Sequence, residues 1–192
     1  MLSIRQQIKN LAVILLLALL SACKAASPVQ AASPAETAAT HMLALINQRL
    51  AVAPLVAQSK WNSGAAIDDP VRETQILDDI ALKAAQEDVD TALARNFFQS
   101  QFDAGKIVQA QLHARWRQQQ LPPFTQAPDL ARDVRPTLDK LTPELIATLK
   151  TLQTHLCDAN VQDLLARRSD SLFNKDWDQA TRERALAPLR CH

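Results

Sequence analysis

The fold of this chain is decided by residues 91–119, which read TALARNFFQSQFDAGKIVQAQLHARWRQQ. Apolar side chains recur in this stretch at the spacing of one helix face, and they are Leu93, Phe97, Phe98, Phe102, Ile107, Val108 and Leu112. At a rise of about 1.5 Å per residue, a helix over the whole stretch is more than about 40 Å long. The sequence Leu121-Pro122-Pro123 ends it, since proline cannot continue a helix.

The composition extends the helical prediction to the rest of the chain. Of 192 residues, 47% are apolar, which is enough to bury a sizeable core in one or at most two domains. Aromatic residues make up 4%, and the chain has two glycines and no tyrosine, a composition that argues against a β-sandwich or barrel. The predicted fold class is all-α, a helical bundle with long N-terminal helices and a separate set of C-terminal helices.

Several function classes are excluded by simple counts. The two glycines, Gly64 and Gly105, lie outside any glycine-rich string, so the chain has neither a P-loop nor a dinucleotide-binding turn. A net charge of +1 argues against nucleic acid as a partner. No metal site is predicted, because the histidines lack metal-ligand spacing; each is expected at the surface, and they are His41, His113, His155 and His192. The tryptophans are expected to pack helices: Trp61, Trp116 and Trp177.

The N-terminus has the pattern of an export signal. Arg5 and Lys9 precede an apolar stretch, Leu11 to Leu20, that is too short to span a bilayer. The following Leu20-Ser21-Ala22-Cys23 resembles the lipobox of bacterial lipoproteins, in which the cysteine is acylated and becomes the mature N-terminus. We therefore expect a lipoprotein signal peptide over 1–22, a lipidated Cys23 and a flexible tether over 23–33. The alternative is an ordinary signal peptide cut near Ala26 or Ala31.

This N-terminus implies a periplasmic protein that a lipid on Cys23 tethers to a membrane. The chain has three cysteines, an odd number for an exported protein. If Cys23 carries lipid, Cys157 and Cys191 remain to form a disulfide, which persists in an oxidising compartment. The alternative is two unpaired, buried thiols.

Helix boundaries are marked by capping residues and prolines. Ser33-Pro34-Ala35-Glu36 is a capping box that opens a helix to about Trp61, with a kink at Pro54 and an end at Asn62-Ser63-Gly64. Asp69-Pro70 opens a second helix, which ends at the acidic residues 87–90.

Shorter helices follow the long one. One begins near Asp129 and is disturbed by Pro136. Another opens at Thr142-Pro143-Glu144 and ends near Cys157. Two more are expected over about 160–172 and 176–188. The residues from 34 to 192 are predicted to form one domain.

Basic residues on otherwise apolar helix faces are the main functional signal. Arg49 and Lys60 are eleven residues apart, which on one helix is three turns plus about 20°, so they share a face. That face also carries Leu45, Val52 and Val56. Arg72 lies in the first turn of a helix, where the helix dipole disfavours a cation. Cations that meet between packed helices indicate an anion site; on periodicity alone, the alternative is that they are solvated charges.

The order of these motifs resembles that of the all-helical chorismate mutases. The matching segments are Asn47-Gln48-Arg49-Leu50, Ser59-Lys60-Trp61, Asp69-Pro70-Val71-Arg72-Glu73 and the long helix with Gln109. The export signal, the additional C-terminal helices and the cysteine pair resemble the secreted, periplasmic (gamma) subclass. The resemblance covers about residues 36–191.

The resemblance implies rearrangement of chorismate to prephenate, which needs no nucleophile, metal or other cofactor. Arg49 would bind a substrate carboxylate, Lys60 a carboxylate and the ether oxygen, and Arg72 would complete a cationic wall. Gln109 would donate a hydrogen bond to the ether oxygen, which a glutamate does in some relatives only when protonated.

Four further residues match substrate-binding positions of the family. Asp69 and Glu73 resemble acceptors for the ring hydroxyl, although Asp69 is equally readable as a plain helix cap. Gly105 replaces the family's usual hydroxyl residue. Arg135 best matches an arginine that the later part of the chain supplies, and Arg132 is the alternative.

Two other functions remain open from the sequence. One is a non-enzymatic helical envelope lipoprotein, which explains the tether and helices but not the spacing of Arg49, Lys60 and Arg72. The other is elimination of pyruvate from isochorismate on the same fold. The subclass also suggests a homodimer.

Overall fold

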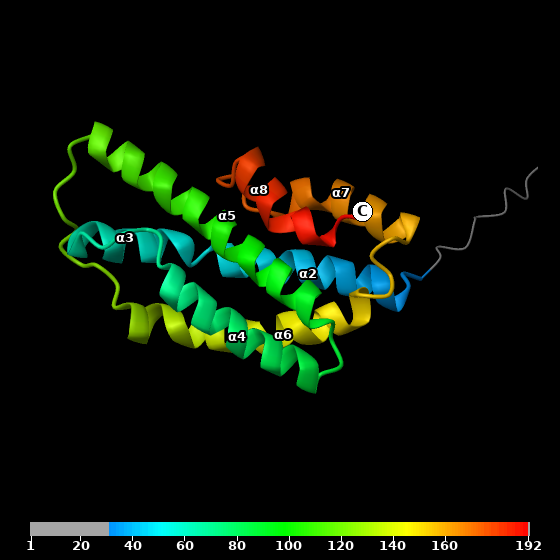
Figure 1. The fold of residues 1–192 in the computed structure, drawn as a ribbon. Coiled ribbons are helices and arrows are strands. Elements are labelled where there is room, and N and C mark those ends of the chain that lie inside the picture. Colours follow the sequence, from blue (N-terminus) through cyan, green and yellow to red (C-terminus); the bar gives the residue numbers. More distant parts are fainter. Residues whose placement is uncertain (1–30, 192) are drawn as a thin grey trace, which may run out of the picture. The chain divides into compact units, whose positions relative to one another are not determined.

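The computed structural model describes residues 31–191 (Figure 1). The expected signal peptide, Cys23, most of the expected tether and His192 lie outside the described residues. Residues 31–191 contain helices and no strand, so the predicted all-α fold class is confirmed. Within the same range, none of the helices combines the length and the hydropathy needed to cross a membrane.

The first predicted helix is two helices, α2 (Pro34–Leu50) and α3 (Ala53–Ser63). The predicted capping box opens α2, with Glu36 N donating to Ser33 Oγ at 3.1 Å. The single helix expected to run on to Trp61 with a kink at Pro54 is wrong, because the chain turns at residues 51–52. Pro54 has no N–H for the preceding turn and stands in the first turn of α3, where none is needed.

The next two helices follow the sequence prediction closely. Gly64 ends α3 with a φ of 70°, a left-handed conformation that glycine adopts without strain. Asp69 caps α4 (Pro70–Gln86) by accepting a hydrogen bond from Arg72 N at 3.1 Å. Asp90 caps α5 (Thr91–Gln118) in the same way, through Leu93 N at 2.7 Å. These two caps fix where α4 and α5, which form a helix pair, begin.

The segment after α5 differs from the prediction. A π-helical turn, η1 (Leu130–Val134), leads into α6 (Arg135–Leu152), which has Pro136 in its first turn and runs through Pro143 without a break. The predicted separate helix from Thr142 to Cys157 is therefore wrong. Asp139, whose carbonyl would accept the missing bond from Pro143, is exposed, so water can replace that donor. Buried side chains hold the helix on both sides of Pro143: Leu141, Leu145, Ile146, Leu149 and Leu152.

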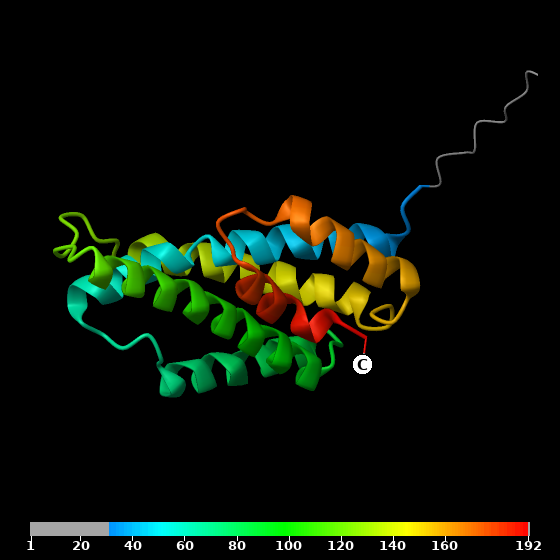
Figure 2. The same ribbon diagram turned by 90° about the horizontal axis from the view of Figure 1, so that it is seen from above.

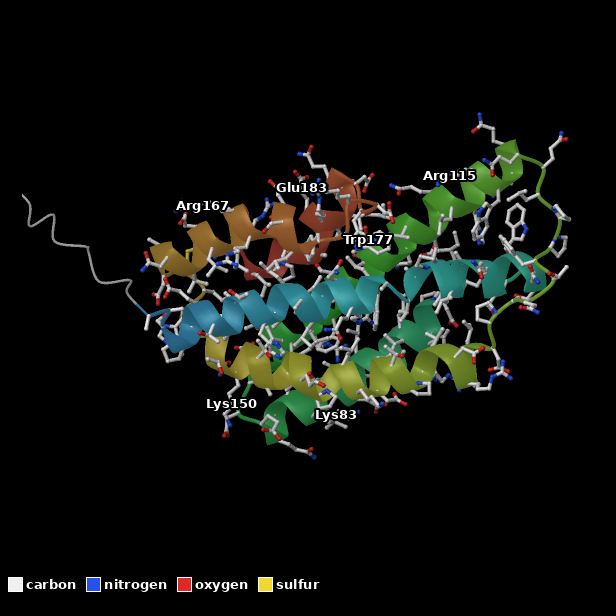
Figure 3. All side chains as sticks on the ribbon, turned by 180° about the vertical axis from the view of Figure 1, so that it is seen from behind. Lys83, Arg115, Lys150, Arg167, Trp177 and Glu183 are labelled. Atoms are coloured by element: carbon white, nitrogen blue, oxygen red, sulfur yellow. A yellow bond between two sulfur atoms is a disulfide. The ribbon has the colours of Figure 1, made fainter. Side chains whose placement is uncertain are left out.

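The C-terminal part contains α7 (Ala159–Leu172), α8 (Gln179–Leu186) and a 3-10 turn, η2 (Ala187–Leu189). The predicted disulfide between Cys157 and Cys191 is present. It links the loop after α6 to the end of the described chain. Trp177, labelled in Figure 3, donates from its indole N–H to Asn47 Oδ1 at 2.9 Å and so fixes the loop before α8 on α2.

Two helices organise the bundle. α2 packs against α6 and α7, whereas α5 packs against α3, α4 and α8 (Figure 1). Viewed from above, α4 lies along α5 on the side of the bundle opposite α7 (Figure 2). The largest fully buried side chains are Phe97, Phe98, Met42, Leu43, Leu45, Ile46, Leu50, Ile80, Leu145, Ile146, Leu149 and Leu152. They come mostly from α2, α5 and α6, so the core lies among these three helices.

The surface position predicted for every histidine is wrong for His113. This residue is 7% exposed, and its Nε2 lies 2.8 Å from the carbonyl oxygen of Ala57. It packs edge-on against Trp61, and Trp116 packs against both Trp61 and Phe124. The sequence prediction failed because a histidine that completes an aromatic cluster has the same local pattern as one that faces water. Trp61 and Trp116 do pack helices, as predicted.

Candidate active site

Every candidate active-site residue lines one cavity of about 340 Å³. It lies among α2, α3, α4, α5 and the η1–α6 segment. The candidate residues that line it are Arg49, Lys60, Asp69, Arg72, Glu73, Gly105, Gln109 and Arg135. Side chains separated by up to 86 positions in the sequence therefore meet at one place.

The remaining wall of the cavity is largely apolar. Its hydrophobic lining comes from most of the surrounding segments and consists of Val52, Ala53, Val56, Ile67, Ile76, Phe102, Leu130, Val134 and Leu138. In such surroundings charges interact more strongly than in water. The cavity thus offers several cations to a ligand that is itself partly desolvated.

Arg49 is the most unusual charge in the site. Its guanidinium lies 5.1 Å from the ring centre of Phe102, and no carboxylate in residues 31–191 forms an ion pair with it. Burial lowers the pKa of Arg49 from its usual value to about 10. The group remains cationic at neutral pH, but folding disfavours its charge, which an anionic ligand would compensate.

Lys60 comes from the last turn of α3. Its Nζ donates to the carbonyl oxygen of Ile67 at 2.6 Å, which holds the ammonium at the cavity wall. Desolvation lowers the pKa of Lys60, and the nearby carboxylates of Asp69, Glu73 and Asp68 only partly oppose this. Although Arg49 and Lys60 lie on two helices rather than one, the intervening turn leaves both at the same cavity.

The start of α4 supplies three candidates. Asp69 is the helix cap, as one of its two sequence interpretations predicts, and it also lines the cavity. Arg72 is exposed at its rim. Glu73, with 18% of its side chain exposed, lies deeper and bonds across to α5.

Gln109 lies one helical turn beyond Gly105 on α5 and is 7% exposed. Its Nε2 donates to the carbonyl oxygen of Gly105 at 3.2 Å, and its Oε1 has no partner among the described residues. The amide therefore keeps a second N–H and a free acceptor for a ligand. A Cβ on Gly105 would lie 4.0 Å from Ala53 Cβ and 4.0 Å from Gln109 Nε2, so the glycine is not required by close packing.

Arg135 and Arg132 differ in what they face. Arg135, at the start of α6, lines the cavity and is otherwise exposed. Arg132 instead forms a two-pronged ion pair with Asp133, at 2.8 Å and 3.0 Å, and is not among the residues that line the cavity. The geometry therefore favours Arg135 as the candidate.

Two lining residues were missed by the sequence analysis. Lys106 contacts three carboxylates and also lines the cavity, and Gln101 is fully buried with an Oε1 that has no partner among residues 31–191. Lys106 shares a polar stripe of α5 with Gln99 and Asp103, which in a sequence is typical of a solvated face. That this stripe faces α4 is decided by tertiary packing alone.

A second cavity, of about 630 Å³, lies between α7 and α8. Of its two basic residues, Arg182 pairs with Asp170 at 3.3 Å, and none of the candidate active-site residues lines this cavity. Among residues 31–191, no group of three or more histidine, cysteine, aspartate or glutamate side chains could hold a metal ion.

Comparison with known proteins agrees with this geometry. Residues 40–110 match the family described as chorismate mutase type II, a range that contains most of the cavity lining. The secreted chorismate mutase of Mycolicibacterium smegmatis is 31% identical over 142 residues, which cover 70% of this chain and 78% of that protein.

Solved structures give the same answer. Chorismate mutase from Burkholderia thailandensis has a TM-score of 0.71 at 37% identity, over 80% of this chain and 99% of that one. The enzyme from Burkholderia phymatum has a TM-score of 0.70 at 28% identity, over 83% and 100%. Secreted chorismate mutase from Yersinia pestis shares the fold, with a TM-score of 0.65 at 19% identity over 78% and 94%. The chain belongs to the all-helical, type II chorismate mutase family of enzymes, and its similarities include the secreted members.

Proposed function

We propose that the cavity binds chorismate and catalyses its intramolecular rearrangement to prephenate. In this reaction an ether C–O bond breaks while a C–C bond forms, and no atom leaves the molecule. The enzyme has to hold the substrate in its folded, reactive conformation and stabilise the negative charge that develops on the ether oxygen. The observation that carries the proposal is the cluster of Arg49, Lys60 and a neutral amide donor in an apolar-walled cavity.

We assign the roles by charge and depth. Arg49, half-buried and without a carboxylate partner among the described residues, binds one substrate carboxylate with its guanidinium fork. Arg72 and Arg135, at the exposed rim, complete the cationic wall around the second carboxylate. Lys60 reaches a carboxylate and the ether oxygen from the α3 side, since its ammonium is already held by Ile67 O.

Gln109 donates to the ether oxygen with the N–H that Gly105 O does not use. Because an amide needs no proton to donate, this contact is independent of pH. Glu73 and Asp69 accept the hydrogen bond of the ring hydroxyl. Gly105 leaves room beside the substrate.

The direct test follows the ultraviolet absorbance of chorismate with the purified mature protein. Conversion to prephenate, identified by NMR, supports the proposal, and loss of at least a hundredfold in kcat/KM in Lys60→Met links it to this cavity. Stable absorbance, or faster release of pyruvate from isochorismate than loss of chorismate, would reject it.

We further propose that the protein is exported to the periplasm and held at a membrane by a lipid on Cys23. The sequence Leu20-Ser21-Ala22-Cys23 supports this, as does the bond between Cys157 and Cys191, which leaves Cys23 as the third cysteine. Mass spectrometry of the N-terminal peptide from a membrane fraction tests it. An unmodified peptide that begins near Ala26 or Ala31 would contradict the lipid anchor.

The resemblance to the secreted subclass supports a homodimer. Light scattering on the purified mature protein should give twice the mass of one chain, and a single-chain mass would contradict this part of the proposal.

A further inference from the structure

Lys106 occupies the centre of a charge cluster between α4 and α5. Its Nζ lies 3.0 Å from Glu73 Oε2, 3.2 Å from Asp103 Oδ1 and 3.3 Å from Asp68 Oδ1. We call these three carboxylates and Lys106 the Lys106 cluster. Lys106 and Glu73 are only 22% and 18% exposed, and both line the cavity.

The cluster differs from an ordinary surface ion pair between the same two helices. Arg95 of α5 contacts Asp78 of α4 at 2.7 Å, but these side chains are 39% and 62% exposed and lie away from the cavity. Exposed ion pairs of that kind contribute little to the stability of the fold. Burial lowers the pKa of Lys106, but hydrogen bonds with Glu73, Asp103 and Asp68 outweigh this and raise it above its usual value.

The two oxygens of Glu73 have different surroundings. Lys106 Nζ and Gln99 Nε2, the latter at 3.5 Å, both approach Oε2. Within residues 31–191, no donor bonds to Oε1. A carboxylate anchored through one oxygen in this way has a fixed orientation and keeps the other oxygen as an acceptor.

Lys106 also reduces the negative charge of the cluster beside a ligand that is itself negative. Without Lys106, the carboxylates of Asp68, Glu73 and Asp103 would repel one another and a dicarboxylate in the cavity. Glu73 would then move away from the cavity toward water, because no other positively charged side chain among residues 31–191 bonds to it.

We propose that Lys106 is a positioning residue: by holding Glu73 Oε2, it presents Glu73 Oε1 to the ring hydroxyl of the substrate. The inference rests on the proposed function, since it assigns the hydroxyl acceptor of that same cavity. It predicts that Lys106 matters for substrates that carry the hydroxyl and much less for substrates that lack it.

The test compares kcat/KM for chorismate with kcat/KM for an analogue lacking the ring hydroxyl. In Lys106→Met, we expect the ratio of the two to fall roughly tenfold, the usual size of one lost hydrogen bond to a charged group. Lys106→Arg, which retains the charge and the donors, should recover most of the ratio. Arg95→Met removes a cation between the same helices and should leave the ratio unchanged.

The outcomes separate the alternatives. An equal loss of kcat/KM for both substrates in Lys106→Met would mean that Lys106 acts only on net charge or folding. No loss of kcat/KM for either substrate would mean that Lys106 forms only a surface ion pair. Either outcome overturns the inference. If Lys106→Met fails to fold, Lys106→Gln is measured by the same ratio. A wild-type protein that converts chorismate while the ratio is unaffected rejects the inference alone, whereas a wild-type protein that leaves chorismate unchanged rejects the proposed function with it.

Discussion

The cavity and the α7–α8 region of the same bundle differ in how their arginines are paired. In α7 and α8, Arg167 pairs with Asp163 and Arg182 with Asp170, and Arg167 points outward from α7 (Figure 3). In the cavity, Arg49 is half-buried against Phe102 without a carboxylate partner among the described residues. The first arrangement costs the folded state little, whereas the second is unfavourable until an anion arrives. The comparison indicates that one region serves the fold and the other the ligand.

The largest expected effect tests whether the α7–α8 region serves the fold. Replacing the disulfide with Cys157→Ser and Cys191→Ser should lower the free energy of unfolding by roughly 3–4 kcal/mol, the value for opening a loop of this length. The kcat/KM of the folded molecules should stay within about twofold, because Cys157 and Cys191 do not line the cavity. Denaturant titration and the chorismate assay measure the two quantities. A large loss of activity at unchanged stability would show that the two regions are coupled.

The second prediction is the reverse case, a large loss of activity without a loss of stability. Arg49→Met should lower kcat/KM at least a hundredfold, or about 2.7 kcal/mol, since the carboxylate clamp is lost. The free energy of unfolding should not fall, because methionine keeps the apolar contact with Phe102 and removes a charge whose burial folding disfavours. Arg167→Met on α7 is the matched control, with unchanged kcat/KM. If Arg49→Met instead unfolds the protein and the folded fraction keeps full activity, Arg49 is structural.

The third prediction concerns pH. Wild-type kcat/KM should be flat from about pH 5 to 8, because Gln109 donates without a proton. It should fall as the pH rises toward 10, where burial has lowered the pKa of Arg49 to about 10 and that of Lys60 below its usual value, so both cations lose charge. Gln109→Glu should add a loss of roughly tenfold between about pH 5 and 7.5, because a carboxylate cannot donate. A steep loss of wild-type kcat/KM as the pH rises over the same range, unaltered by Gln109→Glu, would contradict this role.

The smallest effect is expected at Gly105. Gly105→Ala should raise the free energy of unfolding by up to about 1 kcal/mol, since alanine is the better helix former and its Cβ finds only ordinary contacts at 4.0 Å. Activity should change less than about threefold. Thermal unfolding and kcat/KM check both values, and a lower melting temperature would mean that the glycine is needed for packing.

Where the sequence alone was sufficient, the responsible signals were local. Asp69 before Pro70 and Gly64 after α3 mark helix ends through interactions within a few residues, and the structure has both ends as predicted. Arg49 and Lys60 were identified because cations on apolar faces are unusual. Arg49 and Lys60 lie on two helices rather than the one predicted, and both still line the cavity because the turn at residues 51–52 keeps them there.

The failures all depend on what lies across the fold. Pro143 interrupts a helix only if its neighbours do not compensate, and the buried side chains of α6 do compensate. His113 is buried because Trp61 and Trp116 surround it. Lys106 belongs to the cavity because its stripe of α5 faces Glu73 rather than water. Trp61 is far in sequence from His113, and Glu73 is far from Lys106, so local pattern could not have found these contacts.

The central claim is that Arg49 is held half-buried at the cavity for an anionic ligand. Isothermal titration of the wild type with a bicyclic dicarboxylate that mimics the transition state measures it most directly. We predict one bound molecule per chain, a Kd at least about a hundredfold higher in Arg49→Met, and an unchanged Kd in Arg167→Met. No binding by the wild type, or equal binding by the wild type and Arg49→Met, would contradict the claim.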